Sequence, residues 1–383
     1  MYNSNQQSKV LLNIIFNPLF IFTIVWIISL ISYLFAINIS FIINPNYQIL
    51  LFTFIVSYSI FFITYLSLAI NKNHTTVNNI IKPILQINGY RLKLISRIIL
   101  ISIITIVLYN YHTFGGFPFY SFFGYDVMVY YEYGRFKGLL IPLLTIFGLL
   151  SIFKKNIVYR LVTILFAVSL FVFYILRGPL LAFILQYFIL DTLYKKKYSF
   201  LKRGAVVICL IFVIMNVLGN LRTGNELFLT YFNIKPEFQD INSGILWFLM
   251  YITGSFSDLI TTVQYQNHYL YGISTLNDIL PAFIRFDPIV ANPNLIFIDG
   301  PKTYLAPFFE DFGWVGIIII NLIIAIICFV IHNDSRFNNN LLIIPLLYSS
   351  ISLIFFTNYF FYFYNIVQFI LSIFIFNFIK RAT

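Results

Sequence analysis

Long runs of apolar residues separated by short polar gaps set the pattern of this chain. Ten runs are long and apolar enough to predict membrane-spanning helices, because about 20 apolar residues cross the hydrocarbon core of a bilayer. The pattern predicts an all-α polytopic membrane protein of about ten transmembrane helices, with residues 1–383 forming a single membrane domain. The predicted spans are Pro18–Ile37, Ile49–Ile70, Leu94–Tyr109, Gly138–Phe153, Val158–Leu176, Pro179–Leu193, Gly204–Leu218, Gly313–His332, Leu341–Phe356 and Phe361–Ile379.

Lysine and arginine in the gaps predict which way the spans point. Every gap after an even-numbered run is basic, and Lys9 precedes the first run. Cytoplasmic loops carry an excess of Lys and Arg, so both termini are predicted to lie in the cytoplasm. The odd-numbered gaps are then predicted to face outward, and the largest of them, 219–312, is an extracytoplasmic loop between the seventh and eighth spans.

One outward gap contains only Arg177 and Gly178. The loops on both sides of this pair of runs are basic, so the chain must cross an even number of times and two separate helices are predicted. Gly178 permits a turn, and Pro179 suits the first turn of a new helix. Because the run that follows is short for a bilayer, Arg177 is predicted to sit near the outer headgroups.

The large outer loop contains an apolar stretch of its own. Residues near 245–263 are apolar at helical spacing, but Asp258 and several Ser, Gly and Thr residues interrupt them. We expect an interfacial or re-entrant helix. A full span is the alternative, but it would place the basic C-terminus outside, against the charge rule.

The composition narrows the class of protein. The chain is 60% hydrophobic and 10% charged, with a net charge of +11, whereas soluble domains carry about 25% charged residues. A soluble enzyme, a disordered chain and a nucleic-acid-binding domain are therefore excluded. On the ten-span topology the cytoplasmic side carries 17 basic and 2 acidic residues, against 7 basic and 11 acidic outside.

Several catalytic motifs are absent from the sequence. There is no phosphate-binding glycine loop, no Asp-x-Asp pair and no nucleophile elbow. The four histidines, His74, His112, His268 and His332, lie far apart without metal-ligand spacing. We therefore expect no cofactor and no metal, and chemistry on substrates that carry their own activation.

Four outer cations are candidates for binding an anionic headgroup, above all a diphosphate: Arg177, Arg222, Arg285 and Lys302. Arginine forks bind phosphate oxygens in pairs and stay charged. The alternative for Arg177 and Arg222 is that each simply reaches from a helix end to the headgroups. Arg285 has the alternative of pairing with Asp287.

A glycosyl transferase needs a base for the acceptor hydroxyl, and the candidates are Glu310, Asp311, Asp258 and His268. Glu310 and Asp311 immediately precede the eighth span, so helix capping is their alternative role. For His268 the alternative is an ordinary surface histidine. Aromatic residues crowd the outer segments, where they form either an interfacial belt or faces for sugar rings.

The stretch that closes the large loop carries the most specific motif. It reads T-x-L-x-P-x-x-x-D-F-G-x-x-G and comprises Thr303, Leu305, Pro307, Asp311, Phe312, Gly313 and Gly316. This resembles the signature of bacterial O-antigen and capsule repeat-unit polymerases of the Wzy type. Pro307 is predicted to fix the start of the helix, and the two glycines are predicted to permit close helix approach.

The resemblance implies the GT-C-type fold of metal-independent membrane glycosyltransferases. It implies polymerisation of undecaprenyl-diphosphate-linked oligosaccharide on the outer face of the bacterial cytoplasmic membrane. The partners would be the lipid-linked oligosaccharide, membrane lipids, and a chain-length-regulating co-polymerase and flippase of the same pathway. Two alternatives stay open, namely an O-antigen ligase and a flippase or transporter of lipid-linked sugar, although the chain shows no internal repeat.

Overall fold

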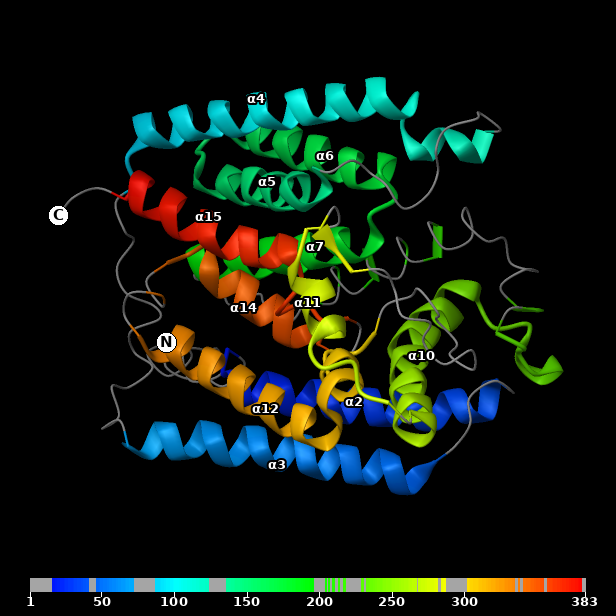
Figure 1. Cartoon of the computed structure of the whole chain (residues 1–383). Helices are drawn as coiled ribbons and strands as arrows, with labels where there is room; N and C mark the ends of the chain where they lie inside the picture. The colour runs from blue at the N-terminus through cyan, green and yellow to red at the C-terminus, as the bar shows by residue number, and fades with distance from the viewer. Residues whose placement is uncertain are drawn as a thin grey trace, which may run out of the picture.

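The computed structural model describes residues 16–40, 46–71, 87–123, 136–195, 232–266, 268–281, 284–286, 302–334, 340–354 and 357–380, with Phe337 and scattered positions between 204 and 230. Within these residues, every predicted span except the seventh forms a helix (Figure 1). The seventh, Gly204–Leu218, lies mostly outside the described residues, and so does Arg222.

In chain order the long helices are α2 (Pro18–Ile39), α3 (Tyr47–Asn71), α4 (Gly89–Phe114), α5 (Lys137–Leu150), α6 (Ile157–Phe173), α7 (Arg177–Lys195), α10 (Ser243–Tyr265), α12 (Ala306–Asn333), α14 (Ile343–Ser352) and α15 (Phe363–Ile379). Shorter elements are η2 (Pro118–Phe123), η3 (Ser151–Phe153), η4 (Pro236–Phe238) and α11 (Ile273–Ile279). The described residues form no strand longer than an isolated bridge.

Asparagine side chains begin several of these helices. Asn17, Asn88, Asn156 and Asn242 each accept a hydrogen bond from a backbone N–H group in the first turn. These N–H groups have no partner within the helix, and Asn is among the best residues at this position. A polar residue directly ahead of an apolar run therefore sets where each of these helices starts.

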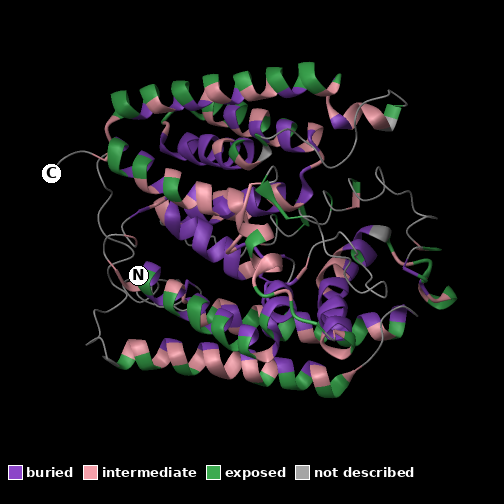
Figure 2. Cartoon of the chain, viewed as in Figure 1, coloured by how far each residue is buried: buried purple, intermediate pink, exposed green. Residues whose placement is uncertain are grey.

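The outer faces of the bundle are apolar. Side chains such as Ile55, Ile101 and Val315 are 57%, 64% and 60% exposed, and Figure 2 shows such exposed positions along the outward faces of α3, α4 and α12. Five helices of the described chain, namely α2, α3, α4, α10 and α12, are long and apolar enough to cross a membrane. The protein is therefore a helical membrane protein, while the count of ten spans stays a prediction.

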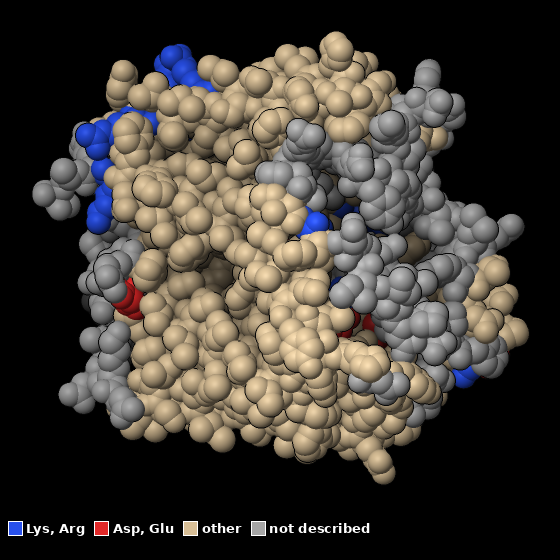
Figure 3. Space-filling view, in the orientation of Figure 1, with Lys and Arg blue, Asp and Glu red and all other residues tan. Residues whose placement is uncertain are grey.

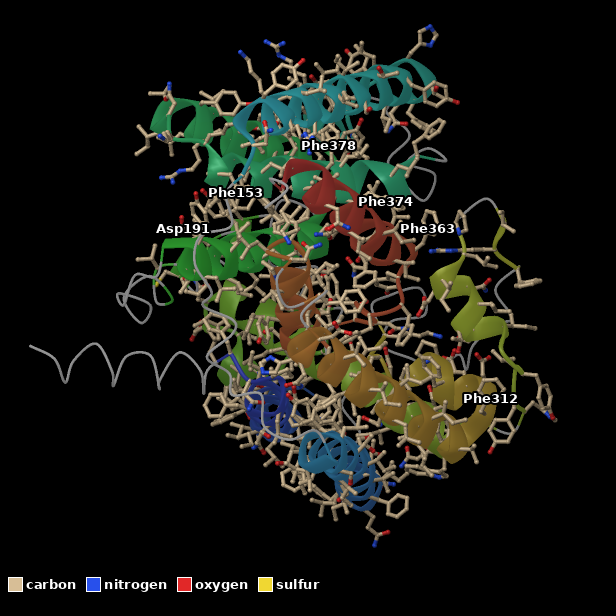
Figure 4. All side chains as sticks on the ribbon, turned by 90° about the vertical axis from the view of Figure 1, so that its left-hand side faces the viewer. Phe153, Asp191, Phe312, Phe363, Phe374 and Phe378 are labelled. Atoms are coloured by element: carbon tan, nitrogen blue, oxygen red, sulfur yellow. The ribbon has the colours of Figure 1, made fainter. Side chains whose placement is uncertain are left out.

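Two hydrophobic clusters divide the bundle into halves. One contains buried residues of α2, α3, α10 and α12, including Trp26 and Phe256. The other contains residues of α4, α5, α6, α7 and α15, including Leu144 and Phe171. Figure 4 shows the two halves end-on, with α4 and its neighbours above and α2 and α3 below. α14 lies between them and is buried from Ile343 to Ile351.

Basic residues from distant parts of the chain gather at one end of the bundle. The Asn88 N–H donates to the Ile379 carbonyl at 2.9 Å, which places the start of α4 beside the end of α15. Burial, followed by the nearby charges of Lys93 and Arg97, lowers the pKa of Lys154. In Figure 3 this end of the bundle is the left-hand edge, and Lys and Arg side chains lie along its upper part. The basic gaps after the second, fourth and tenth predicted spans thus share one end, as alternating topology requires, while the membrane side that this end faces stays a prediction.

The helix expected near 245–263 is α10, a helix of 23 residues. It lies at the opposite end of the bundle and runs across the direction of the long helices (Figure 1). Its Phe256 ring packs edge-on against Trp26 and Tyr33 of α2, with centroids 5.7 and 6.0 Å apart. α10 thus crosses α2 over the stretch from Trp26 to Tyr33, and its depth in the membrane stays a prediction.

Candidate functional site

A break in α12 organises the site. Gly313 has φ +60° and ψ −142°, a conformation that is essentially restricted to glycine. The break folds the first arm, which ends at Phe312, back onto the second, so closely that a Cβ on Gly316 would lie 2.0 Å from the Phe308 carbonyl oxygen. The two motif glycines therefore permit a close approach within one helix, whereas the sequence suggested an approach between two helices.

The other motif residues secure the first arm. Pro307 lies in the first turn of α12, as predicted, where its missing N–H costs nothing. Thr303 and Leu305 are fully buried. The Tyr304 N–H donates to the Ile354 carbonyl at 3.3 Å, which ties the segment ahead of α12 to the end of α14.

The break directs backbone carbonyls of the first arm toward the loop between α10 and α11. A helix end leaves its last carbonyls without partners in the helix. Here the Leu270 N–H donates to the Glu310 carbonyl at 3.0 Å, and the Tyr271 N–H donates to the Asp311 carbonyl at 3.3 Å. The Gln266 side chain also donates to the Glu310 carbonyl, at 2.6 Å. The loop is therefore attached to the first arm of α12.

Asp311 caps a helix, but the helix is α11 and not the eighth span that it precedes. Its two carboxylate oxygens accept the backbone N–H groups of Ser274 and Thr275 at 3.0 and 2.8 Å. The side chain is fully buried. Both oxygens are engaged in holding the start of α11, which gives Asp311 a positioning role. The base role proposed for it from sequence stays a prediction.

Glu310 pairs with the predicted phosphate-binding Lys302. Its Oε1 lies 2.5 Å from Lys302 Nζ, with side chains 7% and 25% exposed respectively. The Ser274 hydroxyl donates to the other oxygen, Oε2, in a short hydrogen bond. Glu310 therefore holds Lys302 at the site and also contacts α11.

Asp278 completes the charged group and was missed by the sequence reasoning. It lies four residues after Ser274, one turn along α11, and its Oδ2 accepts a 2.8 Å hydrogen bond from Asn358 Nδ2. Burial raises the pKa of Asp278 to about 6, against the lowering effects of Asn358, Arg285 and Lys302. The sequence signal for Asp278 was its position four residues after Ser274, which is helical spacing. α11 is too short for that spacing to form a recognisable periodic pattern.

Arg285 is exposed near this group, and its Nε donates to the Leu280 carbonyl at 3.4 Å. Its possible partner Asp287 lies outside the described residues. Asp278 interacts electrostatically with Arg285, Lys302 and Glu310. Figure 3 shows blue atoms and, below them, partly covered red atoms right of centre. Arg285, Lys302, Glu310 and Asp278 therefore form one cluster of mixed charge at this end of the bundle.

Arg177 begins α7 and is only 7% exposed. Its guanidinium carbon lies 5.3 Å from the ring centroid of Trp247 and 5.7 Å from that of Tyr251, both on α10. α6 and α7 are separate helices, but the turn lies before Arg177, with Ile175 at φ +54°. Gly178 was expected to make this turn and instead falls in the first turn of α7, because the helix starts at Arg177, two residues earlier than Pro179 suggested.

A group of tyrosines connects Arg177 to Asp278. Tyr251 packs in the same small cluster as Leu181, Tyr359 and Tyr364. The Tyr362 ring centroid lies 6.3 Å from that of Tyr359 and 5.4 Å from that of Tyr364. Tyr362 and Tyr364 both interact electrostatically with Asp278. The geometry thus joins a buried arginine, a tyrosine cluster and a mixed charged cluster into one continuous region.

Two of the proposed bases take other positions. Asp258 is buried within α10, with its backbone carbonyl accepting from Thr262 at 2.8 Å. It lies about two turns before Gln266 in α10. His268 is exposed, and its backbone carbonyl accepts a hydrogen bond from the Gln266 side chain at 2.9 Å.

The comparisons with known proteins gave no match, because no family model, curated protein or solved structure resembles the chain closely enough. Among the described residues, no three His, Cys, Asp or Glu side chains gather as metal ligands would. The assignment of function therefore rests on the site itself.

The role of Asp311 has a direct test. Asp311→Ala removes the acceptors for two N–H groups of α11, and loss of such a cap costs about 0.5–2 kcal/mol. We expect faster hydrogen exchange at Leu270–Ile279, measured by mass spectrometry on protein in nanodiscs, with α12 beyond Gly316 unchanged. Asp240→Ala, at an exposed carboxylate, is the control. Unchanged exchange in α11 would show that Asp311 does not hold it.

Proposed function

We propose that this protein is a membrane glycosyltransferase that polymerises undecaprenyl-diphosphate-linked oligosaccharide repeat units. Its product would be O-antigen, capsular or exopolysaccharide, made on the outer face of the bacterial cytoplasmic membrane. The observation that carries the proposal is the folded motif segment. Its break at Gly313 places Glu310 and Lys302 beside Asp278 and Arg285, next to tyrosines that lead to Arg177.

The chemistry of this region suits a lipid diphosphate donor. Arginine binds phosphate oxygens with a planar fork, and cations near a leaving group stabilise the charge that develops on it. Arg177 is held over two aromatic rings, so its orientation is set before substrate arrives. Arg177, Lys302 and Arg285 would contact the diphosphate. Arg222, predicted from sequence as a further diphosphate ligand, lies outside the described residues.

The tyrosines suit the sugar part of the same substrate. Each ring offers a flat apolar face and a hydroxyl group, which matches the two kinds of surface on a pyranose. The tyrosines lie at the end of the bundle opposite the basic edge. The donor's headgroup is expected at this tyrosine end. A chain-length-regulating co-polymerase and the flippase that delivers the donor are the proposed partners.

The test is deletion of the gene followed by analysis of surface glycan and lipid-linked intermediates. We expect single repeat units to reach the surface and long chains to disappear, with recovery on expression of the wild-type chain. Complete loss of glycan attachment would indicate a ligase instead. Accumulation of the lipid-linked unit on the cytoplasmic side would indicate a flippase. Normal chain lengths in the deletion strain would overturn the proposal.

A further inference from the structure

We propose that α11 and the turn between α14 and α15 form the acceptor-sugar subsite, in which Asp278 takes the proton of the attacking hydroxyl group. This inference rests on the proposed function, and it names the substrate part and the base that the function requires. The ligand class is the non-reducing-end sugar of a lipid-linked repeat unit.

The carboxyl group of Asp278 is held by Asn358, whose own side-chain oxygen is available to a ligand. Asn358 is fully buried and donates to Asp278 Oδ2 at 2.8 Å. Its own side-chain oxygen, Oδ1, accepts no hydrogen bond from any described residue. A buried acceptor left without a donor costs about 1–3 kcal/mol. A sugar hydroxyl donating to Asn358 Oδ1 would satisfy it and bring a neighbouring hydroxyl to Asp278.

Aromatic rings stand beside this amide and carboxyl pair. Tyr362 and Tyr364 are half-buried, and Tyr359 is buried. The Thr357 hydroxyl donates to the Tyr362 hydroxyl at 2.6 Å, which fixes the orientation of that phenol. Flat ring faces next to a carboxylate and an amide provide both the stacking surface and the hydrogen-bonding groups that a pyranose needs.

The nearby carboxylates of Asp311 and Glu310 are already engaged by other groups of the protein. Asp311 uses both oxygens on backbone N–H groups of α11. Glu310 uses its oxygens on Lys302 and Ser274. Asp278 has a neutral amide as its partner. It is therefore the carboxylate of the cluster best placed to exchange a proton with substrate.

The electrostatic surroundings of Asp278 favour this exchange. Burial is the largest influence and raises its pKa to about 6. Lys302, Arg285 and Asn358 lower that pKa, and Glu310 raises it. Tyr362 and Tyr364 from α15 are the other titratable groups that face it. A base works best when its pKa is near the operating pH, so Asp278 is ionised at neutral pH and still basic enough to accept a proton.

The step balances with these groups alone. The acceptor hydroxyl oxygen bonds to the anomeric carbon of the donor sugar, and its proton passes to Asp278. The bond between that carbon and the diphosphate oxygen breaks, and its electron pair leaves with the lipid diphosphate. Arg177, Lys302 and Arg285 neutralise the charge on the leaving group.

The test uses the purified full chain in nanodiscs with undecaprenyl-diphosphate-linked repeat units isolated from the deletion strain. Asp278→Asn keeps the shape of the side chain and its hydrogen bond from Asn358, but removes the base. We expect kcat to fall roughly 10²–10⁴-fold. Asp278→Glu should retain part of the activity, and Asp240→Asn, at an exposed outer carboxylate, should leave it unchanged.

A pH profile supplies a readout that a structural role would not change. The wild-type rate should fall about tenfold per unit as the pH drops below about 6, because Asp278 must be ionised to accept the proton. The residual rate of Asp278→Asn should be flat over that range. Undecaprenyl diphosphate should raise the thermal unfolding midpoint of wild type and Asp278→Asn equally, since the diphosphate contacts remain.

The outcomes separate the two proposals. If Asp278→Asn keeps the wild-type kcat and pH profile while the wild-type chain polymerises, Asp278 is not the base and the proposed function stands. If the wild-type chain makes no polymer and the deletion strain is normal, the proposed function fails. Loss of the thermal shift with undecaprenyl diphosphate in Asp278→Asn would also overturn the assignment, because it would place Asp278 at the donor.

Discussion

Arg177→Ala should abolish long polymer and leave single repeat units, as expected for the deletion strain. The variant removes a buried guanidinium that lies over Trp247 and Tyr251 at the start of α7. Loss of one donor to a developing oxyanion costs about 10²–10³ in rate, and arginine contributes charge as well. The measurement is the chain-length distribution of surface glycan in the deletion strain expressing each variant, at matched membrane levels of protein.

Two further variants make this result specific. Arg177→Lys keeps the charge but loses the planar fork, so we expect short chains at a reduced rate. Arg97→Ala, at an exposed arginine on α4 that lies at the basic end, should give normal chains. A normal length distribution from Arg177→Ala would remove the diphosphate role from this residue.

Gly316→Ala should destabilise the protein and eliminate activity together. A Cβ at this position would meet the Phe308 carbonyl oxygen at 2.0 Å and the Phe308 carbonyl carbon at 2.7 Å. Backbone atoms cannot rotate away, so the first arm of α12 must shift, and with it Glu310 and Asp311. Overpacking of this kind costs about 1–3 kcal/mol or more. Thermal unfolding of detergent-solubilised protein measures the loss, and the glycan profile reports the site.

The matched control is Gly89→Ala at the start of α4, where an added Cβ meets no atom within 4 Å. Its effect on stability should be neutral or slightly favourable, because alanine restricts the unfolded chain. If Gly316→Ala unfolds at the same temperature as wild type and makes normal polymer, the close approach within α12 is not required.

The periodic parts of the fold were predictable from sequence. Apolar runs marked α2 and α6 within a few residues, because apolar length is a local property. The separation of α6 from α7 was also predictable from the charge of the flanking loops. The exact turn was not, because a strained residue such as Ile175 has no sequence signal.

The site was only partly predictable, because its contacts join distant segments. The predicted outward charges identified Glu310 and Lys302, and the motif identified the two glycines, but neither signal showed that Gly316 faces the Phe308 carbonyl. The hydrogen bond between Asp278 and Asn358 spans 80 residues. Such a pair depends on how α11 packs against the turn before α15, which no local pattern encodes.

The capping of α11 by Asp311 has a consequence for biosynthesis. Among the described residues, the side-chain hydrogen bonds that hold the start of α11 and the Asp278 carboxyl come from later residues, namely Glu310, Asp311 and Asn358. A ribosome makes those residues last. The helices before α10 can therefore enter the membrane and pack while the acceptor region is still unformed. On the proposed function, the chain would become competent only after its final hairpin has been inserted, so a chain that stops early would carry no partly formed acceptor region.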